Sequence, residues 1–487
     1  MGRTATEQRP AARPGWKGFY GPAGGAAMWV DDPAWWRGTT VQVCGIWPWG
    51  VGSSTPMIGV PMGQHLRTGA TVCFDPISWY TRSSLISTPS VFILGEPGLG
   101  KSSAVRRMLL GLAARGVTPF VLGDLKGEYV ELIRALGGQV IRLAAGADRI
   151  NPLDVGDWQK VVAALGEDGA RSYRAGVVDR RLQMVAALAG LIRDQPVTAT
   201  ESAVLRAAIH LLTDREGTEQ PVLGDVYEII SEGPDEVRRV TLYADPGDEE
   251  RYRDYVADLR RTLLALLDGP LGETFNGPTT TPIDPAAAAL CVDISDIDET
   301  DTIRTAATLL AVWSAGFAAI GTAHALADAG LAPQRTFFSV LDEMWRVLQT
   351  GTGLIDRINA LTRLNRHKGT GVAFVTHSMS DLQALPNEAD RAKARGFADR
   401  SAVMMVAAST DDELEAISRV RPLSGAERAA ISSWTSPPGW DADASAVRVG
   451  RGKFAIKVGS RPSIPLQLVL TPTEIALGDT DSRWRSA

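Results

Sequence analysis

The chain contains a glycine-rich segment whose fixed positions all match the phosphate-loop pattern G-x-x-x-x-G-K-[ST]. The segment is Gly95-Glu96-Pro97-Gly98-Leu99-Gly100-Lys101-Ser102. The apolar run before it, residues 90–94, is expected to form a buried strand, and residues 104–114 after it a helix. This order surrounds an anion with backbone N–H groups and a helix N-terminus. We therefore expect a nucleotide phosphate site rather than a chance glycine turn.

Each residue type in this loop has a chemical reason to be there. Glycine at positions 95, 98 and 100 permits positive φ and a close approach of the backbone to phosphate. Lys101 is expected to reach the β- and γ-phosphates, and Ser102 to place its hydroxyl on Mg²⁺. ATP and Mg²⁺ are therefore the expected ligands. The expected nucleotide-binding residues are Gly95, Glu96, Pro97, Gly98, Leu99, Gly100, Lys101, Ser102 and Ser103.

A second apolar strand, residues 337–341, ends in the carboxylates Asp342 and Glu343. Ligands of a doubly wound sheet bind at the carboxyl ends of its strands, so this pair is expected beside the loop. Asp342 is expected to hold Mg²⁺ through its water shell, and Glu343 to polarise the attacking water. The alternative is a strand end followed by a helix cap. Carboxylates in residues 124–129 either approach the same water or cap the next helix.

Three more side chains are candidates for this site, each with an alternative. His377 follows another predicted strand and either bonds the γ-phosphate or the water, or is a strand-end histidine whose hydrogen bonds are satisfied within the protein. Arg363 and Arg366, on a helix predicted over residues 354–367, either act as arginine fingers on a neighbouring subunit's nucleotide or form a solvated basic helix end. The candidate catalytic residues are Lys101, Asp342, Glu343, Arg363, Arg366 and His377.

Strands and helices alternate around these motifs, which predicts an α/β fold with a doubly wound, mostly parallel sheet. We expect a RecA-like P-loop NTPase with an inserted all-α subdomain and a small β-rich lead-in. The expected parts are a poorly ordered arm over residues 1–40, the lead-in over 41–87, an ATPase core over 88–156 and 286–410, the helical insertion over 157–285, and a C-terminal extension with a β-like end over 411–487.

Composition limits the partners and the compartment. The net charge of −6 gives no global basic field, so DNA contact would need a local patch or a ring-pore loop. Cys44, Cys73 and Cys291 lack paired spacing, which argues against disulfides and zinc and favours a reducing cytosol. Residues 306–325 are uncharged and long enough to span a membrane, but their weak hydrophobicity favours a buried core helix. We expect a cytoplasmic protein without a transmembrane segment.

Five motifs stand in a characteristic order: residues 95–102, 124–129, 151–154, 341–343 and 376–378. This order resembles that of the conjugative-transfer ATPases of type IV secretion systems, within the FtsK–HerA superfamily of hexameric motor ATPases. The most specific motifs are Asp-x-Lys-Gly-Glu-Tyr at 124–129 and Asn-Pro-Leu-Asp at 151–154. The resemblance covers about residues 55–410, including the helical insertion. Where the family usually has glutamine, this chain has His377.

The resemblance implies a ring, expected to be a homo-hexamer, with ATP bound between subunits. Hydrolysis would move DNA or protein, or drive channel assembly, in contact with conjugation or secretion machinery at the inner face of the cell membrane. One alternative is a DNA translocase of the same superfamily that acts on chromosomal or phage DNA. An alternative of another class is a scaffold that binds nucleotide without turning it over.

Overall fold

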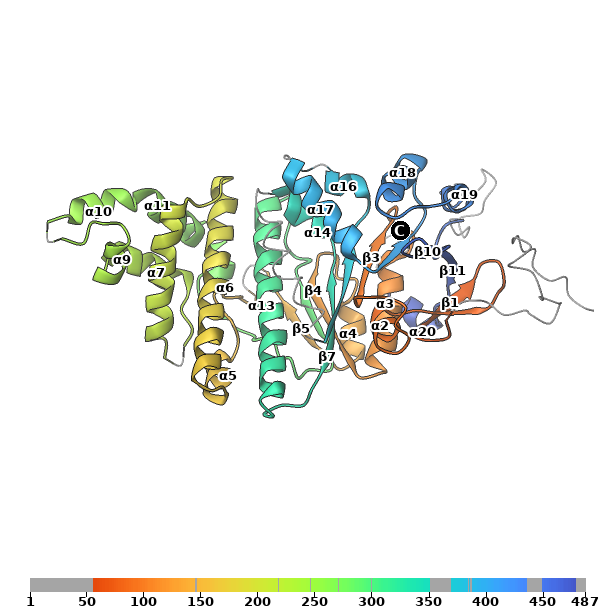
Figure 1. Cartoon of the computed structure of the whole chain (residues 1–487), viewed down its shortest axis with the longest axis horizontal. Coiled ribbons are helices and arrows are strands. Elements are labelled where there is room, and N and C mark those ends of the chain that lie inside the picture. Colours follow the sequence, from red (N-terminus) through yellow and green to blue (C-terminus); the bar gives the residue numbers. More distant parts are fainter. Residues whose placement is uncertain are drawn as a thin grey trace, which may run out of the picture. The chain divides into compact units, whose positions relative to one another are not determined.

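The computed structural model describes residues 56–144, 147–217, 219–245, 247–269, 271–298, 300–350, 369–383, 385, 388–435 and 449–478. Within these ranges, strands form one sheet in the order β2-β1-β11-β10-β9-β3-β8-β7-β4-β6-β5 (Figure 1). The strands are β1 Pro61–His65, β2 Thr71–Cys73, β3 Ser90–Leu94, β4 Val117–Asp124, β5 Gln139–Arg142, β6 Leu290–Asp293, β7 Thr336–Leu341, β8 Thr370–Val375, β9 Val403–Val406, β10 Lys453–Val458 and β11 Ile464–Leu468.

The parallel half of the sheet, from β9 to β5, is the part that the alternating pattern predicts. Every residue of β3 is buried, as expected of a parallel strand with helices on both faces. The strand β7, which ends at the carboxylate pair, is separated from β3 by β8. This arrangement is a RecA-like P-loop fold, and the predicted fold class is confirmed.

The antiparallel half pairs strands from early and late in the described part of the chain. Strand β1 pairs with β11, with Gly63 opposite Leu468, and β10 pairs with β9. The predicted lead-in and C-terminal strands therefore extend the same sheet instead of forming separate pieces. The predicted domain boundaries themselves stay predictions. The arm over residues 1–40, the lead-in up to residue 55 and the helix over 354–367 lie outside the described residues.

Helices fill the connections between these strands. Those preceding the insertion are α2 Pro76–Thr81, α3 Lys101–Ala113 and α4 Val130–Ala135. Between β5 and β6 lie α5 Trp158–Ala164, α6 Glu167–Arg193, α7 Ala199–Arg215, α8 Leu223–Glu232, α9 Asp235–Arg239, α10 Glu249–Tyr255, α11 Ala257–Asp268 and α12 Gly272–Phe275. The remaining helices are α13 Thr302–Asp328, α14 Met344–Thr350, α16 Met379–Gln383, α17 Glu388–Arg400, α18 Asp411–Val420, α19 Gly425–Ser433 and α20 Pro472–Leu477.

The Asn-Pro-Leu-Asp motif fastens the helical insertion at its entry and exit. The Asn151 side-chain amide donates to the Pro221 carbonyl at 2.9 Å, and the Asp154 carboxylate accepts from the Thr279 hydroxyl at 2.7 Å. Arg181, fully buried on α6, donates to the Leu153 carbonyl at 3.0 Å. These contacts give the motif a structural role, because they stabilise the junction between the sheet and the helical insertion.

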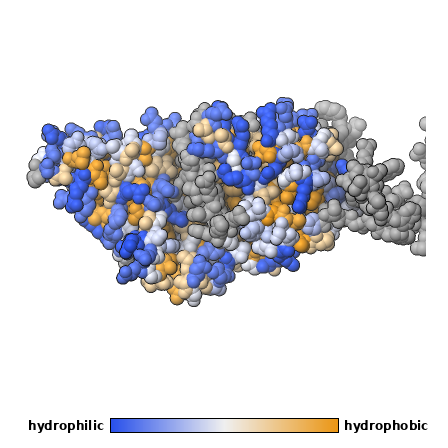
Figure 2. All heavy atoms as spheres, viewed as in Figure 1, coloured by the Kyte–Doolittle hydropathy of each residue, from blue (hydrophilic) through white to orange (hydrophobic). Residues whose placement is uncertain are grey.

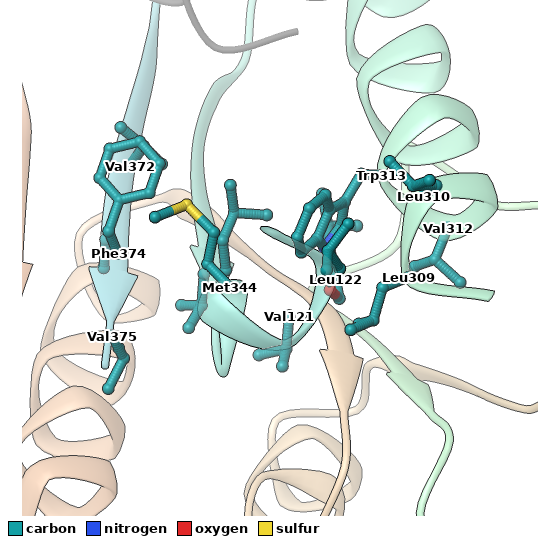
Figure 3. Packing of buried hydrophobic residues seen from close by; sticks show 14 of the residues in the cluster. Val121, Leu122, Leu309, Leu310, Val312, Trp313, Met344, Val372, Phe374 and Val375 are labelled. Carbon is teal, nitrogen blue, oxygen red and sulfur yellow. Dashed lines mark hydrogen bonds between the residues drawn. The ribbon is translucent and has the colours of Figure 1, made fainter. Parts of the chain in front are cut away.

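Helix α13 packs on the sheet through its apolar side chains. The Trp313 indole N–H donates to the Leu122 carbonyl of β4 at 2.7 Å, and Figure 3 shows Leu309 and Leu310 beside this contact. Among the described helices, only α13 is long and apolar enough to cross a membrane, and 83% of its most apolar window is buried. It is a core helix, as predicted. Hydrophilic and hydrophobic residues are interspersed on the face of the molecule shown in Figure 2.

Glu427 ties the start of α19 to the β10–β11 hairpin. Its carboxylate accepts from the backbone N–H groups of Ser424 at 2.7 Å and Ser463 at 2.6 Å, and from the Lys457 ammonium at 3.1 Å. Burial alone would raise the pKa of Glu427, but these donors together lower it from 4.5 to about 2. The ionised carboxylate therefore stabilises the fold.

We expect Glu427→Gln to lower the free energy of unfolding by about 2 kcal/mol at pH 7. Because the pKa is lower in the folded state, this loss should shrink as pH falls below 4.5 and vanish near pH 2. Urea titrations at pH 7 and pH 3 measure both values. Glu415→Gln, at an exposed pair with Arg419, is the matched control and should change stability by less than about 0.5 kcal/mol. A difference that does not depend on pH would contradict the assignment.

Candidate nucleotide-binding site

The glycine loop has the backbone that phosphate binding requires. Gly95, Gly98 and Gly100 have φ values of 144°, 77° and 94°, and a Cβ at Gly95 would lie 2.5 Å from the Ala407 Cβ. Helix α3 begins directly after Gly100, and no side chain caps its N-terminus. Its first N–H groups are therefore available to an anion. The loop also has a backbone contact with a distant segment, because the Gly452 N–H donates to the Leu99 carbonyl at 2.9 Å.

The Lys101 ammonium lies inside this loop and is buried. It donates to the carbonyls of Gly95 at 2.6 Å and Glu96 at 3.1 Å, and to Nδ1 of His377 at 3.0 Å. Burial lowers the pKa of Lys101 to about 8, although the carboxylates of Asp342 and Glu343 act in the opposite direction. The lysine expected to bind phosphate thus connects the loop to the end of β8.

Asp342 and Glu343 follow β7 and have different surroundings. Asp342 is half-buried and accepts from the Tyr129 hydroxyl at 2.8 Å and from the Glu343 N–H at 2.9 Å. Burial, together with the charge of Glu343, raises the pKa of Asp342 to about 7. Burial would also raise the pKa of Glu343, but bonds from His377 and Lys126 hold it well below its usual value. Adjacent carboxylates with opposite shifts can take different roles in one reaction.

The segment after β4 reaches the same site, and its two carboxylates have different partners. Asp124 accepts three backbone N–H groups, those of Lys126, Glu128 and Tyr129, so it caps the turn. Glu128 instead accepts from the Ser102 hydroxyl at 2.6 Å. The sequence pattern singled out this segment, but it did not identify the contacts of Lys126 and Tyr129 with the carboxylates after β7.

His377 joins the two halves of the site. Its Nδ1 accepts from Lys101, and its Nε2 lies 3.0 Å from Oε1 of Glu343, which assigns the proton to Nε2. His377 is thus a strand-end histidine with both ring nitrogens hydrogen-bonded, and its contact with the γ-phosphate or the water stays a prediction. The Ser103 hydroxyl accepts from the Arg106 guanidinium at 3.1 Å. Arg363 and Arg366 lie outside the described residues.

The residues present fit a magnesium ion held mainly by phosphate and water. No group of three or more His, Cys, Asp or Glu side chains in the described part of the chain could hold a metal alone. Mg²⁺ bound with nucleotide typically takes only one or two protein ligands. Asp342 is a half-buried carboxylate whose two described partners are neutral donors, so a cation beside it would offset its charge. Ser102 supplies a hydroxyl on the adjoining loop.

The fold and the loop define a RecA-like P-loop fold of the kind that binds nucleotides. VirB4 of Thermoanaerobacter pseudethanolicus has the same fold, with 19% identity and a TM-score of 0.64, over 88% of this chain and 100% of that chain. Plasmid coupling protein TrwB in complex with ADP and Mg²⁺ aligns with 14% identity and a TM-score of 0.45, over 84% of this chain and 89% of that chain. No family model and no curated protein matches the sequence. The predicted resemblance to conjugation and secretion ATPases is confirmed for the fold.

Proposed function

We propose that the chain is a Mg²⁺-dependent ATPase that hydrolyses ATP to ADP and phosphate. The observation that carries this proposal is the hydrogen-bonded series Lys101–His377–Glu343, which links the phosphate loop to the carboxylate that would polarise water. A chance glycine turn would not bring these three side chains together from the ends of three different strands. Both motifs predicted from the sequence contribute to this one cluster.

The candidate site residues have separate roles in that reaction. The loop N–H groups and Lys101 bind the phosphates, with the ammonium exchanging its carbonyl partners for phosphate oxygens. Ser102 and Asp342 hold Mg²⁺, which when bound neutralises phosphate charge. Glu343 orients the attacking water and takes its proton. Arg363 and Arg366 are retained as proposed arginine fingers that would act on a neighbouring subunit.

The work driven by this hydrolysis is proposed to be conjugative DNA transfer or type IV secretion. The support is the order of the five sequence motifs together with the fold that the chain shares with VirB4. In this proposal the chain forms a ring, a homo-hexamer with ATP between subunits. It acts at the cytoplasmic face of the inner membrane with the secretion machinery. Chromosomal or phage DNA translocation is the competing form of the same chemistry.

Phosphate release from gel-filtered full-length protein, with and without DNA, tests this function. We expect release that requires Mg²⁺ and stops in EDTA. Stimulation by DNA that weakens steeply with salt would favour a DNA-moving motor, because ion release on phosphate binding makes affinity depend on ionic strength. Nucleotide binding without any phosphate release would overturn the ATPase assignment and leave a nucleotide-gated scaffold.

A further inference from the structure

The carboxylate of Glu343 is held by three donors at once. Its Oε1 accepts from Lys126 Nζ at 2.8 Å and from His377 Nε2 at 3.0 Å, and its Oε2 accepts from the Trp345 indole N–H at 2.5 Å. A carboxylate has about four acceptor positions. The three donors leave one position, on Oε2, while Oε1 already accepts two bonds, one of them from a full positive charge. A water molecule that presents a proton to Oε1 must therefore displace an existing bond.

The backbone at Glu343 is also restrained. Its φ of 51° lies in the left-handed region, which is unfavourable for a residue with a Cβ. The residue stands in the sharp turn between β7 and α14, and its N–H is bonded to Asp342. Strain of this kind persists when surrounding contacts fix the conformation, and it is concentrated at functional sites. The three donors are the contacts that fix the side chain here.

Lys126 differs from the other two donors in its freedom to move. Its side chain is 42% exposed, whereas that of Glu343 is 5% exposed. The Lys126 backbone is fixed, since its N–H donates to Asp124, so the side chain can leave without moving the loop. His377 is tied to Lys101 as well, and Trp345 is only two residues from Glu343 in the same turn. Lys126 is thus the charged partner that can be released most readily.

We propose that Lys126 is a positioning residue that restrains Glu343, and that its ion pair must open before Glu343 can act as the base. This inference rests on the proposed function. In hydrolysis the water oxygen bonds to the γ-phosphorus, the bond from phosphorus to the bridging oxygen breaks, ADP leaves with that electron pair, and Glu343 takes the water proton. Only the last event uses an acceptor position of Glu343, and on Oε1 such a position becomes available when Lys126 leaves. The restraint limits turnover until the site is filled.

The decisive substitution is Lys126→Met, which keeps the length of the side chain and removes its charge. We expect basal phosphate release to rise by about 5- to 20-fold, because a half-exposed charged hydrogen bond no longer has to open. The affinity for a fluorescent ATP analogue should stay within about twofold. Lys126→Arg keeps a cation and should return the rate toward that of the wild type. Lys160→Met, at an exposed pair with Asp157, is the matched control.

A second readout needs no nucleotide. In protein labelled with 5-fluorotryptophan, the Trp345 fluorine resonance, assigned by its loss in Trp345→Phe, reports on the indole that bonds Glu343. Lys126→Met should shift this resonance, and Lys160→Met should not. A lower rate with weaker ATP-analogue binding would make Lys126 a phosphate ligand and overturn the restraint, as would an unshifted Trp345 resonance. If the wild type binds nucleotide but releases no phosphate, the proposed function fails, while the resonance still tests the restraint.

Discussion

Glu343→Gln is expected to lower the steady-state rate of ATP hydrolysis by roughly 10²–10⁴-fold, the usual contribution of a general base. The amide oxygen can accept the two bonds that Oε1 makes with Lys126 and His377, whereas the amide NH₂ cannot accept from the Trp345 indole. The amide also cannot take a proton from water. In the proposed function the nucleotide contacts are made by the loop and not by this side chain, so a fluorescent ATP analogue should bind with nearly unchanged affinity. Single-turnover phosphate release and analogue titration on the same preparation measure the two effects separately.

Lys101→Ala provides the contrast. This substitution removes the ammonium that would bind the phosphates, so both affinity and turnover should fall. It also breaks the link to His377. Retained turnover in both variants would exclude this site as the place of hydrolysis. Loss of binding in Glu343→Gln would instead show that the carboxylate supports the loop structurally.

Local pattern predicted the fold and half of the site because the relevant signals are contiguous. The apolar run before Gly95, the glycines and the following helix are all within one segment, and the sheet brings Asp342 and Glu343 to the same edge. The start of α3 at Lys101, three residues before the predicted start, reflects the left-handed Gly100 that ends the loop. The glycines before Lys101 are typical of a loop, so the pattern predicted a helix start that lies too late in the sequence.

The local sequence pattern could not predict contacts between residues that are far apart in the sequence. Lys126 and Glu343 are 217 positions apart, and their bond depends on β4 lying beside β7 in the sheet. The pairing of β1 with β11 depends likewise on the path of the whole chain. Even Pro119, a residue that argues against a central strand, is accommodated in β4, because the β4–β6 pairing begins only at Phe120.

Trp313→Ala is the second substitution with a large expected effect, here on stability. The indole is fully buried between α13 and β4 and donates to the Leu122 carbonyl. The gap cannot close easily, because the helix already approaches the strand closely: a Cβ at Gly316 would lie 2.4 Å from the Leu122 Cδ2. We therefore expect the free energy of unfolding to fall by about 3–5 kcal/mol.

Trp313→Phe separates packing from hydrogen bonding at the same position. The smaller ring keeps most of the apolar contact seen in Figure 3 but loses the indole N–H, which leaves the Leu122 carbonyl without this donor. The expected loss is about 1–3 kcal/mol, less than that for alanine. Urea titrations of the nucleotide-free protein compare the variants. Equal losses for the two would show that the hydrogen bond, and not the volume of the ring, joins α13 to the strands that carry the site.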